Sequence, residues 1–244
     1  MYSSFLLTAC SGEKETENTA KATDKNETKQ SINLTYIAEI PTMDVTKATD
    51  SESMNVMRNV FEGLYTLGED NKLIPGVAQS YEVSEDKKTY TFHLRESKWS
   101  NGTPVTAADF VFSWKRAVNP NTAAEYVFLF FDIKNAKRIN SKELPIDELG
   151  VKAIDDKTLE VQLERPVPYF IDLTFATFLP INEKYFNSKG KQYGLEAEQL
   201  IYNGAFTLDN WKHEQGFQLK KNSNYWDAKT VKLDEINFDI VKDK

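Results

Sequence analysis

Apolar and polar residues alternate along several short stretches of the chain, a spacing typical of β-strands with one buried face. The first stretch is 31–37, in which Ile32, Leu34 and Tyr36 alternate with polar residues. Further stretches come in pairs around short polar turns, which predicts β-hairpins. These pairs are 81–83 with 89–95, 151–154 with 158–163, and 206–211 with 217–221. A final strand is predicted at 236–240.

Two segments show the spacing of helices instead. In the first, apolar residues recur on one helical face, and they are Met57, Val60, Phe61 and Leu64. Ser53 is a plausible N-cap for this helix. In the second, Thr106 and Asp109 have the spacing of a capping box, which predicts a helix that carries Phe110 and Trp114 into a core. Helices and strands are therefore mixed throughout, and we expect an α/β fold.

The overall composition excludes several classes of function. With 244 residues and 40% hydrophobic content, the chain can bury one large core or two small ones. A net charge of −7 argues against a general binder of nucleic acid or anionic membranes. Two histidines and one cysteine leave little material for a zinc site, and we expect no metal and no cofactor.

The N-terminal region is different in character from the rest. Residues 11–30 contain no Val, Ile, Leu, Met, Phe, Trp or Tyr, so we predict a disordered polar linker over 11–31. Before it, Leu7-Thr8-Ala9-Cys10 resembles a bacterial lipobox, which implies a diacylglycerol anchor on Cys10. A signal peptide needs a basic start and a longer apolar stretch. We therefore interpret residues 1–10 as the remnant of a lipoprotein signal peptide; the alternative is a chance free cysteine.

Several unrelated short motifs occur in one order along the chain. They are Phe61-Glu62-Gly63-Leu64, Pro75-Gly76-Val77-Ala78, Tyr90 to Arg95, Trp99 to Thr106, Glu164 to Phe170, Asn203-Gly204-Ala205-Phe206 and Asn224-Tyr225-Trp226. In this order the chain resembles the oligopeptide-binding lipoproteins of peptide ABC transporters, the solute-binding protein family 5. The resemblance covers residues 32 to 244, and it matches the N-terminal portion of the family.

The resemblance implies a periplasmic-binding-protein-like fold of type II. It assigns 32–61 and 182–244 to a discontinuous module of the first lobe, and 62–181 to an α/β module inserted into it. Members of this family continue for about as much chain again. The first lobe is therefore expected to be incomplete, and the second lobe to be absent.

The same resemblance implies a function and its partners. The family captures oligopeptides on the extracytoplasmic face of the cell membrane, in the periplasmic or cell-wall space, and delivers them to an ABC permease. The chain is thus expected to be no enzyme, to be held at the membrane through Cys10, and to bind no nucleic acid. Its relatives also bind dipeptides, nickel chelates, haem or oligosaccharides, and these cargoes remain alternatives.

Two regions match segments that contact the ligand in the family. Thr49, Asp50 and Ser51 match a segment whose backbone meets the ligand, although Asp50 and Ser51 could equally lead into a helix cap. Tyr126 matches a tyrosine that contacts the bound peptide, although it could be an ordinary core or surface aromatic. Arg58 is a weaker third candidate, since it could sit in a solvated ion pair.

Other chemistry-bearing residues have simpler interpretations. We interpret Asn203-Gly204 as a tight turn in which the glycine supplies a positive φ, and the four tryptophans as core residues. His93 is expected on a solvated strand face, and His213 in a hairpin turn. Asp155 and Asp156 lie in an exposed hairpin turn and are expected to keep ordinary pKa values. An alternative is a hydrolase that uses these surface carboxylates, although they lack the burial that tunes catalytic acids. A last alternative is an inert fragment that exposes apolar surface which the rest of a family member's chain would cover.

Overall fold

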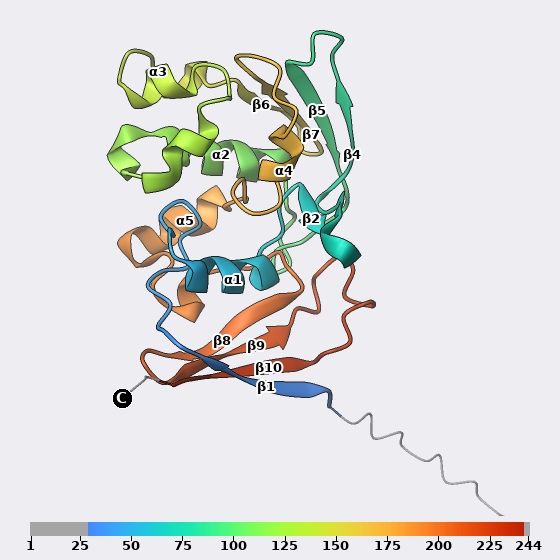
Figure 1. Cartoon of the computed structure of the whole chain (residues 1–244), viewed down its shortest axis with the longest axis vertical. Coiled ribbons are helices and arrows are strands. Elements are labelled where there is room, and N and C mark those ends of the chain that lie inside the picture. The colour runs from blue at the N-terminus through green and yellow to red at the C-terminus, as the bar shows by residue number, and fades with distance from the viewer. Residues whose placement is uncertain (1–28, 242–244) are drawn as a thin grey trace, which may run out of the picture.

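The computed structural model describes residues 29–241 and contains two four-stranded β-sheets with helices packed between and around them (Figure 1). One sheet, which we call the terminal sheet, combines the first strand of the described chain with the last three. The other, the central sheet, is built from the middle of the chain. This mixture of helices and strands confirms the predicted α/β class.

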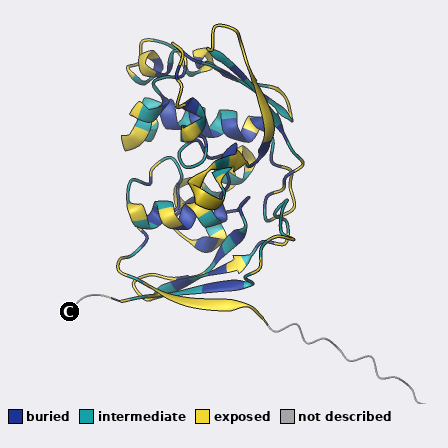
Figure 2. Cartoon of the chain, turned by 45° about the vertical axis from the view of Figure 1, so that its right-hand side comes forward, coloured by how far each residue is buried: buried dark blue, intermediate teal, exposed yellow. Residues whose placement is uncertain are grey.

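The terminal sheet has the strand order β1-β10-β9-β8. Its strands are β1 (Ser31–Tyr36), β8 (Phe206–Lys212), β9 (Gly216–Lys221) and β10 (Glu235–Ile240). β1 pairs parallel with β10 and forms an exposed edge, as Figure 2 shows. The prediction of a linker through residue 31 is wrong at its end, because Ser31 begins β1 and the Gln30 carbonyl accepts the Asp234 N–H at 2.8 Å.

The central sheet has the order β4-β5-β7-β6 and confirms both predicted hairpins. Its strands are β4 (Ala78–Val83), β5 (Thr89–Leu94), β6 (Val151–Asp155) and β7 (Thr158–Gln162). Alternate residues of β5 and β7 are buried, as the period of two requires. α2 (Ala107–Val118) packs on β6, and the Asp109 carboxylate accepts the Thr106 N–H at 2.9 Å, as the capping-box spacing predicts.

α1 (Ser51–Val60) lies between the terminal sheet and the upper helices and contacts β8. The prediction of Ser53 as its N-cap is wrong. Asp50 is the N-cap, because its Oδ1 accepts the Ser53 N–H at 2.7 Å, while Ser53 is buried in the first turn. The helix ends at Val60, so Leu64 is buried beyond it rather than on its face.

Shorter elements connect these parts. The strands are β2 (Tyr65–Leu67) and β3 (Leu73–Pro75), and the α-helices are α3 (Ala136–Asn140), α4 (Phe170–Leu173) and α5 (Glu183–Lys189). The 3₁₀ helices are η1 (Glu69–Asn71), η2 (Pro120–Thr122), η3 (Glu125–Phe130), η4 (Ile146–Glu148), η5 (Gly190–Gln192) and η6 (Ala197–Gln199). Across residues 29–241, no helix is both long and apolar enough to span a bilayer.

The strand pairing agrees with a discontinuous module, since β1 lies in one sheet with the last three strands of the described chain. However, α5 and α2, which lie on opposite sides of the expected module boundary at residue 182, pack against each other. The ring of Phe186 on α5 packs 5.5 Å from that of Phe112 on α2. The division into two modules therefore stays a prediction, and the two parts share one buried core.

Candidate functional site

The structure brings together two of the three regions predicted to contact a ligand. The Tyr126 hydroxyl donates a hydrogen bond to the Thr49 carbonyl oxygen at 3.1 Å. These residues are 77 positions apart in the sequence. The contact joins the segment before α1 to η3, which follows α2 in the chain. Their role in ligand binding stays a prediction, while their proximity is a property of the fold.

The backbone of Thr49–Ser51 is held by hydrogen bonds on both sides. Before it, the Asp44 carbonyl accepts the Ala48 N–H at 3.0 Å and closes a turn. After it, Asp50 caps α1. Ser51 is exposed, and Thr49 and Asp50 are half-buried. The capping interpretation of Asp50 is thus correct.

Tyr126 lies on η3 and is partly exposed. Tyr126 is 38% exposed, and Phe128 is 56% exposed. The two rings meet edge to face, with their centroids 5.8 Å apart. A tyrosine so placed offers an apolar ring face and a polar hydroxyl to a molecule at the surface.

A narrow apolar cavity of about 30 Å³ lies beside Tyr126. A cavity of that size has room for about one or two water molecules. Its walls come from the segment before α1, from α1, from the end of α2, and from residues near α4. The lining residues are Val45, Thr46, Ala48, Met54, Met57, Ala117, Ala124, Tyr126, Phe130, Ala176 and Thr177. Four alanines and two flexible methionines make walls that could adapt in shape.

The third predicted region, Arg58, lies on the exposed face of α1. Its Nη1 is 3.5 Å from the Asn55 Oδ1, and its guanidinium lies 5.8 Å from the centre of the Phe175 ring. It contacts these residues rather than Thr49 or Tyr126. Cys10, the predicted lipidation site, lies outside the described residues.

A buried carboxyl group was missed in the sequence. Glu62 follows α1 and is 5% exposed, and its two oxygens accept hydrogen bonds from Tyr225 Oη at 2.5 Å and Trp226 Nε1 at 2.7 Å. Burial raises the pKa of Glu62 to about 7, although the two donors and the charge of Arg95 act in the opposite direction. The Arg95 guanidinium stacks 3.6 Å from the centre of the Trp226 ring. Both Glu62 and the Tyr225-Trp226 pair belong to motifs visible in the sequence.

The interpretation of Asn203-Gly204 as a turn with positive φ is wrong. Asn203 is fully buried, its Oδ1 accepts the Glu62 N–H at 3.1 Å, and its Nδ2 donates to the Glu62 carbonyl at 2.8 Å. Gly204 does not adopt a positive φ. It is small because α1 passes close by: a Cβ there would lie 2.6 Å from the Val60 carbonyl carbon.

The hairpin-turn aspartates and most of the tryptophans lie where the sequence predicted them. Asp155 and Asp156 are exposed, and a hydrogen bond from the Lys157 N–H lowers the pKa of Asp155 instead of leaving it ordinary. Trp99, Trp114 and Trp211 are buried, as predicted. Trp226 is only half-buried, and its Nε1 donates a hydrogen bond to Glu62, so the interpretation of Trp226 as a core residue is wrong.

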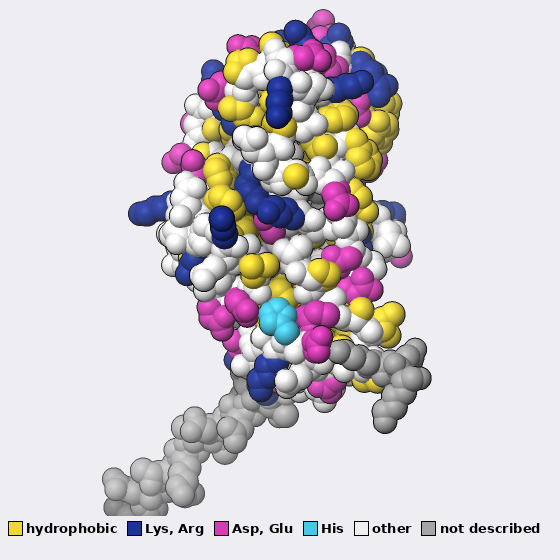
Figure 3. Space-filling model, turned by 90° about the vertical axis from the view of Figure 1, so that its left-hand side faces the viewer, with side chains coloured by type: hydrophobic (Ala, Val, Ile, Leu, Met, Phe, Trp, Pro, Cys, Tyr) yellow, Lys and Arg dark blue, Asp and Glu magenta, His cyan; other side chains and the backbone are white. Residues whose placement is uncertain are grey.

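Both histidines lie beside carboxylates at the surface. Nε2 of His93 is 3.5 Å from Glu82, and the two ring nitrogens of His213 are 3.3 Å from Glu39 and 3.4 Å from Glu196. Figure 3 shows acidic side chains gathered around a histidine on one face. Burial lowers the pKa of His213, but the carboxylates of Glu39 and Glu196 act in the opposite direction, and the net effect is a raised pKa. No group of three or more potential metal ligands occurs within residues 29–241.

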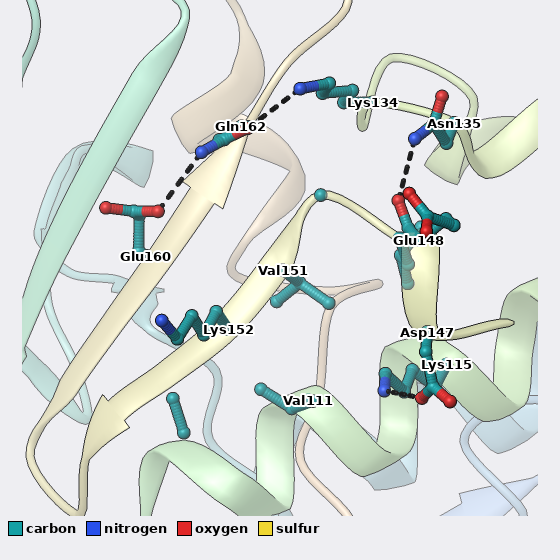
Figure 4. Close-up of a pocket in the computed structure, with 13 residues that line it drawn as sticks. Val111, Lys115, Lys134, Asn135, Asp147, Glu148, Val151, Lys152, Glu160 and Gln162 are labelled. Carbon is teal, nitrogen blue, oxygen red and sulfur yellow. Dashed lines mark hydrogen bonds and ion pairs between the residues drawn. The ribbon is translucent and has the colours of Figure 1, made fainter.

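A larger and more open hollow, of about 680 Å³, lies between α2, β6 and η4 (Figure 4). Lys115 binds Asp147 at 2.6 Å, and Lys134 contacts the Gln162 side chain at 3.3 Å. Three lysines and three carboxylates line this hollow, so neither positive nor negative charge dominates its surface. Neither Thr49 nor Tyr126 lines it.

Comparison with known proteins agrees with this fold. The family model described as "Bacterial extracellular solute-binding proteins, family 5 Middle" matches residues 72–244. The chain is 39% identical over 240 residues to the oligopeptide-binding protein OppA of Bacillus subtilis, covering 97% of this chain and 44% of that protein.

Two solved structures are similar to the chain as well. The substrate-binding domain of an oligopeptide ABC transporter from Bacillus anthracis is 56% identical, with a TM-score of 0.86 over 87% of this chain and 42% of that one. Listeria monocytogenes OppA bound to peptide is 45% identical, with a TM-score of 0.85 over 87% of this chain and 43% of that one.

The chain thus spans less than half the length of these relatives and corresponds to part of one lobe of their fold. Its relatives are extracytoplasmic solute-binding transport proteins, and several of them bind oligopeptides. With a matching family model over most of its length, the chain belongs to family 5 of the bacterial extracellular solute-binding proteins.

Proposed function

We propose that this chain is the front part of an extracytoplasmic receptor that captures oligopeptides, either nutrient or signalling, and delivers them to an ABC permease. The observation that carries the proposal is the contact between Tyr126 Oη and the Thr49 carbonyl. It joins, on one surface, two regions that the family resemblance independently assigns to peptide contact. The peptide-bound relative from Listeria monocytogenes supports oligopeptides as the cargo.

The proposed mode of binding is recognition of the peptide main chain. Backbone N–H and C=O groups of an exposed segment can pair with an extended peptide much as a strand adds to a sheet. Such bonds do not depend on side-chain identity, so many sequences are accepted. Thr49–Ser51 would supply backbone groups, and Tyr126 would supply a ring face and a hydroxyl. Arg58 is retained as a weaker contact.

The proposal places the receptor at the membrane through a lipid on Cys10. A diacylglyceryl group supplies two acyl chains, and two chains anchor a protein stably where one is marginal. Metabolic labelling with an alkyne fatty acid tests the anchor, and the label should disappear in Cys10→Ala. A label that persists in this variant would contradict it.

Calorimetry of the chain with tetraalanine tests the function directly, with free alanine and maltotriose as controls. The proposal expects heat of binding with the peptide alone. Tyr126→Ala should weaken binding at least about fivefold, which is about 1 kcal/mol. Tyr169→Ala is the matched control, because Tyr169 is also exposed and donates one hydrogen bond, to Asp132.

Other outcomes distinguish the alternatives. Binding of maltotriose, a nickel–histidine chelate or haem in place of tetraalanine would show the same fold with another cargo. Aggregation of the purified chain, with no binding to any of these probes, would favour the inert fragment.

A further inference from the structure

We infer that the ion pair between Asp44 and Arg116 positions the two halves of the candidate ligand site relative to each other, an inference that rests on the proposed function. The pair is bidentate: Nη1 of Arg116 lies 2.7 Å from Oδ1 of Asp44, and Nη2 lies 2.6 Å from Oδ2. Only 12% of the Arg116 side chain and 5% of the Asp44 side chain are exposed.

Asp44 organises the segment that leads into the first half of the site. Its carboxylate accepts hydrogen bonds from the N–H and the hydroxyl of Thr46 at 3.1 and 2.9 Å. Its carbonyl accepts the N–H groups of Lys47 and Ala48 at 2.9 and 3.0 Å. The resulting turn ends directly before Thr49. A shift of the Asp44 side chain would therefore displace the backbone proposed to meet the peptide.

Arg116 precedes Tyr126, the second half of the candidate site, as Asp44 precedes Thr49–Ser51, the first half. It lies in the last turn of α2, and the chain then passes through η2 and a left-handed residue, Ala123, to Tyr126. On its other side, the guanidinium stacks 4.6 Å from the centre of the Phe186 ring. The residues that follow the two partners, Val45 and Ala117, both line the cavity beside Tyr126. The ion pair thus joins two walls of that cavity.

A second attachment holds Asp44 from the opposite side. The Gly194 carbonyl accepts the Met43 N–H at 2.7 Å. A Cβ at Gly194, whose φ is +84°, would lie 2.6 Å from the Asp44 nitrogen. The Asp44 backbone is therefore packed against residue 194, and its carboxylate is the part that reaches α2.

The chemistry of the ion pair is better suited to fixing the relative position of the two segments than to raising the free energy of unfolding. The planar fork of an arginine fixes both distance and orientation of a carboxylate, which apolar packing does not do. Replacing a buried ion pair with apolar residues is often neutral for stability, since both charges have lost their hydration. Geometry is therefore the property that this pair contributes.

Hydrogen exchange of the full chain, followed by mass spectrometry, tests the inference without any ligand. The variants are Asp44→Asn, Arg116→Met and the double variant, with Lys115→Met as the matched control. Lys115 is the preceding residue on α2, and its ion-pair partner Asp147 is 84% exposed at the surface. We expect exchange over 45–51 and 121–131 to be about tenfold faster or more in the pair variants. Exchange should be unchanged over 151–162, and everywhere in Lys115→Met.

The double variant separates positioning from stability. It leaves no unpaired buried charge, so its melting temperature should lie nearer to that of the wild type than either single variant's does. The fast exchange over 45–51 and 121–131 should nevertheless persist, and tetraalanine affinity should fall at least about fivefold. If the double variant does not fold, Arg116→Lys takes its place, because it keeps the charge and loses the fork.

Wild-type exchange over both stretches in the double variant would overturn the inference, as would unchanged tetraalanine affinity. The exchange result does not depend on peptide binding. If the wild type binds no tetraalanine while the exchange pattern is as expected, the proposed function fails and the coupling of the two segments stands.

Discussion

Replacement of Asn203 by alanine should destabilise the chain strongly, although no ligand or surface is involved. The Asn203 side chain is fully buried and satisfies both backbone groups of Glu62, with bonds of 3.1 and 2.8 Å. An alanine removes the amide and leaves a buried N–H and a buried C=O without their partner. The two segments held by this bond are 141 residues apart.

The magnitude follows from the cost of leaving a buried polar group unsatisfied, which is about 1–3 kcal/mol for each group. The two backbone groups together give about 2–6 kcal/mol. The total stability of a domain is about 5–15 kcal/mol, so this loss is a large share of it. Asn203→Ala should therefore shift the urea midpoint visibly, or unfold the chain altogether.

Urea unfolding monitored by tryptophan fluorescence measures this loss. Asn187→Ala is the matched control, because Asn187 is an exposed asparagine on α5. It should change the free energy of unfolding by no more than about 0.5 kcal/mol. An Asn203→Ala variant as stable as the control would refute the reasoning, and would mean that the Glu62 backbone finds other partners.

Two further predictions concern the surroundings of Glu62. Because burial raises its pKa from 4.5 to about 7, the folded state binds a proton more tightly than the unfolded state. Stability should therefore fall as pH rises from about 4.5 to 7, and Glu62→Gln should flatten this dependence in thermal melts; an unaltered profile would count against a protonated Glu62. Gly204→Ala should cost about 1–3 kcal/mol or more in urea unfolding, since its Cβ would overlap the Val60 backbone, and a neutral result would mean that α1 can shift away.

The strands of the two four-stranded sheets were predictable because their evidence is local, whereas the three-residue strands β2 and β3 were not predicted. In β5, the alternation of Tyr90, Phe92 and Leu94 with polar residues identifies both the strand and its buried face. The capping box at Thr106 is equally local, since the carboxylate that satisfies the backbone lies three residues away. Asp50 and Ser53 show the limit of such evidence: both residue types cap helices, and only the structure shows which side chain reaches the free N–H.

Features that depend on distant contacts could not be found in this way. Glu62 is paired with residues more than 160 positions away, and nothing in the local pattern states that its motif meets Tyr225-Trp226. The same holds for the contact between Thr49 and Tyr126, which only the family resemblance suggested. A buried asparagine beside a glycine was visible at Asn203-Gly204, but close packing against α1 and a tight turn predict the same two residues.

The central claim is that Thr49–Ser51 and Tyr126 form one surface that binds a peptide backbone. Titration of the isotope-labelled chain with tetraalanine, followed by nuclear magnetic resonance, tests it most directly, because chemical shifts report even millimolar affinity. The account predicts that the largest shifts occur at the amides of residues 48–52 and 124–128, and that they are absent with free alanine. Shifts confined to other parts of the chain, or none at millimolar peptide, would contradict it.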